Sequence, residues 1–175
     1  MLKLIVLAVI VFVAVVLVLA STKPDTFRVE RSASIKAPPE KIFSILNDLQ
    51  QWKGWSTWEK MDPAMKKTFG GPASGTGASY EWQGNNKVGH GRMEITESIP
   101  PSRLVIKLDF FKPMEAHNQA EFTLRPNGEY TEVNWAMHGP SPFMSKVFQV
   151  FVSMDKMVGK DFEDSLAGLK AVAEQ

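Results

Sequence analysis

Two pairs of side chains have the types and the spacing that general acid–base catalysis needs. His90 and Glu94 lie four residues apart, and so do His117 and Glu121. Both pairs fall in segments that alternate like β-strands, where residues i and i+4 point to the same face of a sheet. A carboxylate in this position could orient an imidazole that accepts a proton from a substrate.

The alternation around these histidines favours a solvated surface over an active site. His117 and Glu121 alternate with Ala120, Phe122 and Leu124, so they belong to the polar face of the predicted sheet. Antiparallel sheets commonly bury one face and leave the other in solvent. We therefore assign no catalytic residue from the sequence.

Motifs for metals, phosphate and nucleophilic catalysis are absent. The chain has no cysteine, no HExxH motif and no closely spaced pair of histidines, so we predict no metal site and no cofactor. Gly70-Gly71 and Gly75-Thr76-Gly77 lack the lysine and the following helix of a phosphate-binding loop, and there is no G-x-S-x-G elbow. The formal net charge of +1, without a run of five like charges, argues against a nucleic-acid partner.

The N-terminus is the first element that must position any site. Every residue from Leu4 to Ala20 is apolar, and as a helix this stretch would span roughly 25 Å, near the short end of what crosses a bilayer core. We predict a single-pass transmembrane anchor at residues 1–20, and a signal peptide that ends before Ser21 is the alternative. Because the N-terminal tail is very short, we place the following domain on the extracytoplasmic, periplasmic side of the inner (plasma) membrane.

A linker and one domain follow the apolar segment. Residues 21–25 are polar and contain a proline, which predicts the linker, and the domain occupies residues 26–175. Phe27 to Ile35 alternate as a half-buried strand, with Arg31 as the exception on its apolar face. The stretch from Lys53 to Gly75 ends in turn residues and is predicted to be a loop.

The remaining elements follow from apolar periodicity and from the positions of prolines and turns. We expect a helix at 38–49, strands at 78–83, 88–99, 104–110, 116–125 and 133–137, and one long helix from Ser141 to Leu169. Gly159 lies inside that last helix and is a plausible bend, since glycine is about 1 kcal/mol less favourable than alanine there.

Three tryptophans lie within seven residues, directly after the first helix of the domain. They are Trp52, Trp55 and Trp58. A packed tryptophan buries about 150–250 Å² and its indole N–H needs a partner. The cluster therefore predicts a structural corner or the wall of a pocket.

Five segments together resemble the helix-grip superfamily of START-like and polyketide cyclase-like domains, also called SRPBCC or polyketide cyclase/dehydratase and lipid transport. The resemblance covers about Thr26 to Glu174 and is closest in character to a bacterial branch with an N-terminal hydrophobic segment. It rests on Ala37–Phe43, Trp52–Pro63, Gly75–Trp82, Pro100–Leu104 and Met157–Leu169. It implies an α+β helix-grip fold, in which a curved antiparallel β-sheet wraps around a long C-terminal α-helix. It also implies a deep cavity between them for an apolar or amphipathic small molecule, and no particular reaction.

Residues on the apolar faces of the strands and of the terminal helix are predicted to line this cavity, with ordinary core packing as the alternative for each. They are Tyr80, Trp82, Met93, Leu108, Phe110, Phe122, Trp135, Met137, Met154, Met157, Val158 and Phe162. Arg31 and Asn118 interrupt otherwise apolar faces. With Tyr80 they are the candidates for contacting the polar end of a ligand, unless they pair with buried backbone or with Glu97.

Three functions fit these residues. The leading hypothesis is membrane-tethered binding of a hydrophobic or amphipathic small molecule, such as a lipid, an isoprenoid or a polyketide-like compound, without chemistry. The second is a polyketide cyclase/dehydratase-like enzyme with Tyr80 or a histidine as acid or base. The third is a protein-interaction module that uses the groove or the Trp52–Trp58 corner, as some relatives that assist chaperones do.

Overall fold

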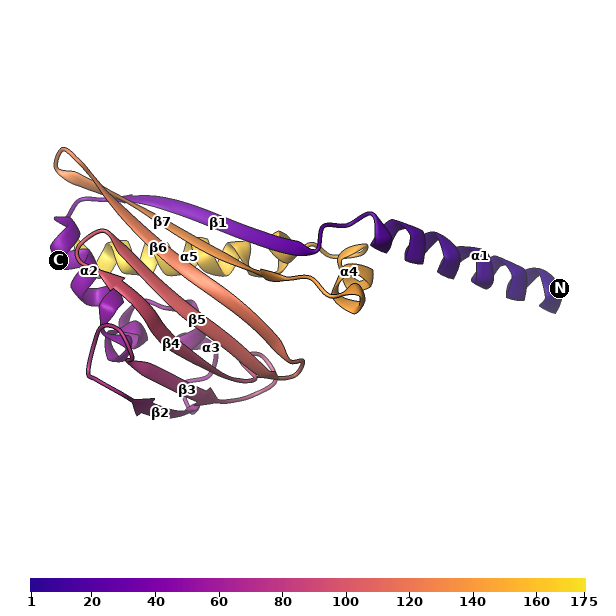
Figure 1. The fold of residues 1–175 in the computed structure, drawn as a ribbon, viewed down its shortest axis with the longest axis horizontal. Helices are drawn as coiled ribbons and strands as arrows, with labels where there is room; N and C mark the ends of the chain where they lie inside the picture. Colours follow the sequence, from indigo (N-terminus) through magenta and orange to yellow (C-terminus); the bar gives the residue numbers. More distant parts are fainter.

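A helix and a domain make up the chain, and the computed structural model describes all 175 residues. Helix α1 (Leu2–Ser21) projects away from a domain that begins with strand β1 (Thr26–Ile35) (Figure 1). α1 is long and apolar enough to cross a membrane by length and composition, and only Val16 and Ala20 in it are buried. The core of the domain is therefore built from the rest of the chain.

Seven antiparallel strands form one sheet in the order β1-β7-β6-β5-β4-β3-β2. After β1 they are β2 (Lys66–Gly70), β3 (Ser79–Gln83), β4 (His90–Ile99), β5 (Arg103–Lys112), β6 (Ala116–Asn127) and β7 (Tyr130–Pro140). The first strand of the domain pairs with the last, from Thr26 opposite Pro140 to Ile35 opposite Thr131. The short strands β2 and β3 lie at the other edge.

Helices precede β2 and follow β7. They are α2 (Pro39–Asn47), the 3-10 helix η1 (Leu49–Gly54) and α3 (Thr57–Met61), then α4 (Phe143–Gln149) and α5 (Met154–Ala173). α5 lies across one face of the sheet and contacts β1, α2 and α3 (Figure 1). The predicted α+β helix-grip fold, an antiparallel sheet packed on a long C-terminal helix, is confirmed.

The alternation of residue types determines which face of the sheet is buried. Leu104 and Ile106 of β5 are buried on the side of α5. The opposite face carries ion pairs between strands, such as that of Arg103 Nε on β5 with Glu121 Oε1 on β6 at 2.6 Å. One face of the sheet therefore packs in the core, and the other faces solvent.

The predicted loop at Lys53–Gly75 is wrong in part, because it contains α3 and β2. β2 pairs with β3 along its whole length, from Lys66 opposite Gln83 to Gly70 opposite Ser79. Four of its five residues are exposed, so it lacks the apolar alternation that reveals a strand in a sequence. The strand forms because the free edge of β3 offers it hydrogen-bond partners.

The predicted single terminal helix is also wrong, because residues 150–153 separate α4 from α5. The Ser153 hydroxyl accepts a hydrogen bond from the backbone N–H of Lys156 at 3.3 Å and caps a new helix. Gly159, where a bend was expected, does not interrupt α5. The break therefore follows from a capping serine and not from the glycine.

An aromatic cluster joins the sheet, α5 and the segment around η1. Trp135 of β7 stacks on Phe122 of β6, with ring centroids 4.8 Å apart, and on Phe162 of α5 at 4.1 Å. Trp55 and Trp58 make T-shaped contacts with Trp135 at 5.9 and 5.7 Å. The tryptophan cluster is thus a structural corner packed against both layers of the domain.

Replacement of Trp55 tests this corner. Its side chain is fully buried, so we expect Trp55→Ala to lower the free energy of unfolding by about 3–5 kcal/mol. Tyr130→Ala, at a side chain that is 42% exposed, is the control, with an expected loss under about 1 kcal/mol. Equilibrium denaturation of the full chain in detergent, followed by circular dichroism, measures both. A loss at Trp55 no larger than at Tyr130 would contradict its place in the core.

Gly168 allows α5 to approach the backbone of Trp55. A Cβ at this position would lie 2.5 Å from the Trp55 carbonyl oxygen, which belongs to rigid backbone. Alanine is the better helix former by about 1 kcal/mol, but overpacking costs typically about 1–3 kcal/mol. The close approach explains why a glycine is present inside α5.

We therefore expect Gly168→Ala to destabilise the chain by about 1–2 kcal/mol in denaturant titrations, against its helix propensity. Gly54→Ala, in η1, is the control, because a Cβ at this exposed glycine would meet no atom within 4 Å. A Gly168→Ala chain more stable than the wild type would contradict the close packing of α5 on Trp55.

Candidate functional site

A cavity of about 190 Å³ lies between the sheet and the N-terminal half of α5, and 15 of its 18 lining residues are hydrophobic. Val158 and Phe162 of α5 form one wall, and Trp58 and Glu59 of α3 form another. Strands β3 to β7 supply the floor. The alternating residues of each strand point their apolar side chains into the cavity because that face of the sheet is turned toward α5.

Nine of the residues predicted from the sequence line this cavity. They are Tyr80, Trp82, Met93, Leu108, Phe110, Trp135, Met137, Val158 and Phe162. Phe122 is fully buried and packs beneath Trp135 in the core instead. Whether the nine touch a ligand stays a prediction.

Arg31 is a correction to the predicted site, because it does not line the cavity. Its Nε donates to Glu163 Oε1 at 2.7 Å and its Nη1 donates to Asp155 Oδ1 at 2.8 Å, both on α5. Gly159 lies between these acids on the same helix, and a Cβ there would collide with the guanidinium. The hydrogen bonds to Asp155 and then Glu163 raise the pKa of Arg31. Arg31 therefore links β1 to α5 through two ion pairs.

Asn118, Met154 and Met157 also lie outside the cavity. Asn118 is buried on β6 and its side chain fills the space above Gly139 of the neighbouring strand. Met154 begins α5 and is half-buried, and Met157 points into solvent. A helix buries only one stripe. Met157 lies off the stripe of Val158 and Phe162, and Met154 lies on it but one turn before the cavity.

A buried carboxylate supplies the polar part of the cavity wall. The Tyr80 hydroxyl donates to Glu59 Oε1 at 2.7 Å, and Lys67 of β2 forms an ion pair with Glu59 Oε2. The Glu59 side chain is only 7% exposed, so its charge depends on both partners. Burial, and then the hydrogen bond to Glu59, raise the pKa of Tyr80 far above its usual value.

Sequence reasoning missed Glu59, and with it Lys67. Both lie in the segment that was predicted to be a loop. Without a predicted strand or helix, the sequence could not show which way their side chains point. The one usable signal was Tyr80, because a buried phenol needs a hydrogen-bond partner. Further lining residues from this region and the next turn are Trp52, Ser56, Trp58, Met65, Lys87 and Val88.

The histidines lie on the solvent face of the sheet, as the alternation predicted, and not in the cavity. His117 Nδ1 lies 2.7 Å from Asp109 Oδ1 on β5, and His90 Nε2 lies 3.1 Å from Glu81 Oε1 on β3. The hydrogen bond to Asp109 raises the pKa of His117. His90 and His117 thus each pair with a carboxylate on a neighbouring strand and not with the carboxylate four residues along their own strand.

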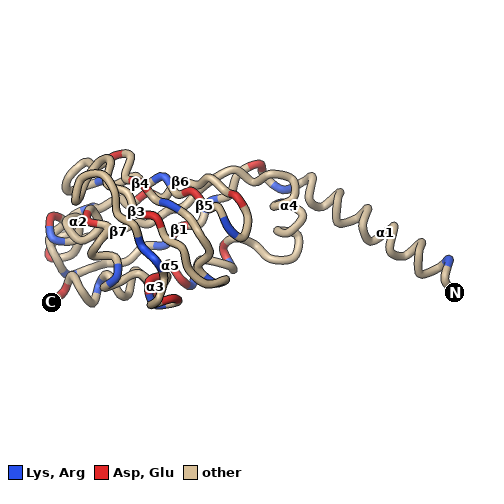
Figure 2. Tube along the Cα trace, turned by 90° about the horizontal axis from the view of Figure 1, so that it is seen from below, with Lys and Arg blue, Asp and Glu red and all other residues tan.

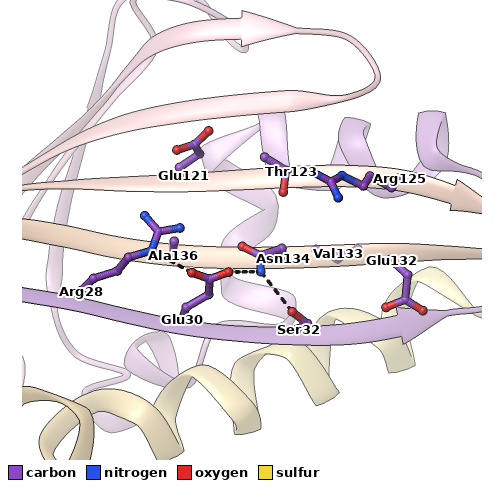
Figure 3. A pocket seen from close by; sticks show the side chains of 10 residues that line it. All are labelled: Arg28, Glu30, Ser32, Glu121, Thr123, Arg125, Glu132, Val133, Asn134 and Ala136. Carbon is purple, nitrogen blue, oxygen red and sulfur yellow. Dashed lines mark hydrogen bonds and ion pairs between the residues drawn. The ribbon is translucent and has the colours of Figure 1, made fainter.

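A second hollow, of about 350 Å³, lies on this solvent face over β1, β7 and β6 (Figure 3). The Asn134 amide donates to Glu30 Oε1 at 2.5 Å, and Arg28 Nε donates to Glu30 Oε2 at 2.7 Å. These two bonds, that of Asn134 first, hold the pKa of Glu30 below its usual value. Because five of its ten lining side chains are charged and it opens to solvent, we treat this hollow as a solvated surface.

The pKa of Tyr80 can be measured, since the chain has only two tyrosines. In Tyr130→Phe, phenolate absorbance reports Tyr80 alone, and we expect none near the ordinary value of about 10. A raised folded pKa stabilises the fold fully below the unfolded pKa, and this contribution is lost as the pH rises toward the folded value. Ionisation near pH ~10 in the folded chain would contradict the buried contact with Glu59.

Comparison with known proteins identifies the family of the domain. The family model described as polyketide cyclase / dehydrase and lipid transport matches residues 26–174. A search of curated protein sequences finds no match.

Solved structures share the fold at low sequence identity. Protein CV1439 from Chromobacterium violaceum superposes with a TM-score of 0.59 at 16% identity, covering 87% of this chain and 99% of that one. The Aha1 dimer from Colwellia psychrerythraea gives 0.56 at 20% identity, covering 85% and 96%. The di-domain aromatase/cyclase BexL gives 0.61 at 14% identity, covering 90% of this chain and 53% of that one. With its fold, its cavity and a family match over nearly the whole domain, the chain belongs to the polyketide cyclase/dehydrase and lipid transport family.

Proposed function

We propose that the domain binds an apolar or amphipathic small molecule in the cavity under α5, without chemistry, and that α1 tethers it to a membrane. The proposal rests on the cavity itself, because 15 of its 18 lining residues are hydrophobic. Apolar lining with a few placed polar groups is typical of small-molecule sites. The family description names lipid transport, which agrees with this class of ligand.

The volume of the cavity limits what it holds in this conformation. An apolar cavity of about 150 Å³ in another protein accepts benzene, whereas pockets for drug-sized ligands have about 300–1,000 Å³. At about 190 Å³ the cavity fits one ring or a short acyl segment. A larger lipid, isoprenoid or polyketide-like ligand requires movement of the flexible side chains of Met65, Met93 and Met137, which line it.

The carboxylate in the wall favours a ligand with a hydrogen-bond donor. Tyr80 and Lys67 each donate to one oxygen of Glu59. A carboxylate has about four acceptor positions, so it can accept further bonds from a hydroxyl or amine. A ligand carboxylate beside Glu59 would instead meet like charge in a partly desolvated place, and Lys87, the one cation among the lining residues, is exposed. An amphipathic alcohol or amine therefore suits the site better than a fatty acid.

The tether follows from the length of α1. Its 20 residues rise about 30 Å as a helix, which is the thickness of the hydrocarbon core of a bilayer. We place the domain on the extracytoplasmic side of the inner membrane. There the cavity stays close to the bilayer from which an apolar ligand partitions.

The other two functions have less support from the same residues. A phenol with a raised pKa is a poor general acid at neutral pH, and the Tyr80 proton is already donated to Glu59. The histidines lie on the far face of the sheet from the cavity. Trp52 and Trp55 are buried and Trp58 is half-buried, so the tryptophan corner offers little apolar surface to a protein partner.

Filling the cavity tests the binding function. Val158→Phe adds a ring to the cavity wall, and Met157→Phe adds the same ring at the adjacent, exposed position outside it. Native mass spectrometry of the full chain released from detergent micelles then counts bound apolar molecules. We expect Val158→Phe to lower occupancy about tenfold, which corresponds to about 1.4 kcal/mol, and Met157→Phe to leave it unchanged.

Titration with isoprenoid and fatty alcohols extends the same measurement to weak ligands. A wild-type chain that carries no apolar molecule, and that gains none from these alcohols, would remove the support for binding. Equal occupancy in Val158→Phe and Met157→Phe would place the bound molecule outside the cavity.

A further inference from the structure

Large apolar side chains are exposed on and directly after α4. Met144 is 76% exposed, Phe148 is 50% exposed and Phe151 is 60% exposed. Phe143 and Val152 are exposed beside them. We call these five residues the α4 surface. Soluble proteins rarely leave apolar side chains gathered in this way without a partner.

The α4 surface is fixed to the base of α1. α1 contacts α4, and the two buried residues of α1, Val16 and Ala20, lie in its last two turns. In the linker, the backbone carbonyl of Asp25 accepts a hydrogen bond from the Ser141 N–H at 2.7 Å, and its carboxylate forms an ion pair with Lys146 of α4. The direction of α1 and the position of α4 are therefore coupled (Figure 1).

The contact with α1 sets the depth of α4. Val16 precedes the end of α1 at Ser21 by five residues, or about 7 Å at the rise of an α-helix. Amphipathic helices that lie in the membrane interface are buried to about 5–10 Å. A helix packed against α1 at Val16 is thus at interfacial depth if α1 spans the bilayer.

The charge distribution permits this depth. Residues 139–153 contain a single charged side chain, Lys146, and Asp25 neutralises it. Charged residues crowd the rest of the domain and are sparse over α1 and α4 (Figure 2). Lys23 of the linker and Lys156 of α5 are exposed, where they can reach lipid headgroups.

We infer that the α4 surface inserts into the interface of the same bilayer that α1 crosses, so that the domain is docked on the membrane and not only tethered to it. This inference rests on the proposed tether. The occupant of the surface is lipid, because α1, the helix that α4 contacts, is itself apolar and long enough to cross a bilayer. α5 begins just after the α4 surface, and Val158 in the cavity wall lies four residues, about 6 Å, along it.

Depth-resolved fluorescence quenching tests the inference, and a chain without cysteines allows single labels without background. Bimane is attached to the full chain in lipid vesicles at Phe148→Cys, Phe151→Cys or Met144→Cys. Glu129→Cys, on the β6–β7 hairpin, is the aqueous control, and Val9→Cys reports the tether. Since all three test side chains are exposed, their replacement leaves the core intact.

We expect brominated lipids to quench the labels at 144, 148 and 151 several-fold more than the label at 129, and iodide in the water to do the reverse. Iodide quenching at 148 and 151 equal to that at 129, with bromolipid quenching at 9, would overturn the docking and leave the tether standing. Labels shielded from both quenchers would show contact with protein, such as a second copy, and would also overturn it. A label at 9 that bromolipids do not reach would overturn the tether and this inference together.

Discussion

The stacking of Trp135 on Phe122 and Phe162 is the interaction on which the rest of the domain depends. It is the place where the sheet and α5 meet face to face, with ring centroids 4.8 and 4.1 Å apart. Trp55 and Trp58 close the same cluster from the side of η1 and α3. Aromatic pairs contribute about 0.5–1.5 kcal/mol beyond their buried area, so the cluster holds three separate parts of the chain at one point.

The cavity exists because this cluster and a second contact keep α5 away from part of the sheet. Phe162 is held by Trp135, and Arg31 of β1 pairs with Asp155, two turns before Phe162, and with Glu163, directly after it. Gly159 gives the guanidinium room to lie across the helix. Between these contacts and the β3–β5 side of the sheet, the side chains do not meet, and about 190 Å³ is left open.

The sequence predicted the fold well and the chemistry of the site poorly, for physical reasons. Strands such as β5 were visible because Ile106, Leu108 and Phe110 alternate with Lys107 and Asp109. β2 was invisible because an exposed edge strand has no buried face. Arg31 illustrates the limit in the site, since its place on an apolar face suggested a ligand contact, while its partners lie more than 120 residues away on α5. No pattern in the sequence singles out Glu59, and its contact with Tyr80 becomes visible only in the folded structure.

The two walls of the cavity differ in how far they can move. On the α5 side, the stacked rings and the Arg31 ion pairs fix Val158 and Phe162 in place. On the opposite side, Met65 and Met93 have flexible side chains, and β2 and β3 are the shortest strands, with five residues each. Fewer hydrogen bonds hold a short edge strand than a long central one, so local opening there costs less free energy. We therefore expect a ligand larger than the present cavity to be accommodated by movement of the β2–β3 edge, where Glu59 and Lys67 also lie, while the helix stays in place.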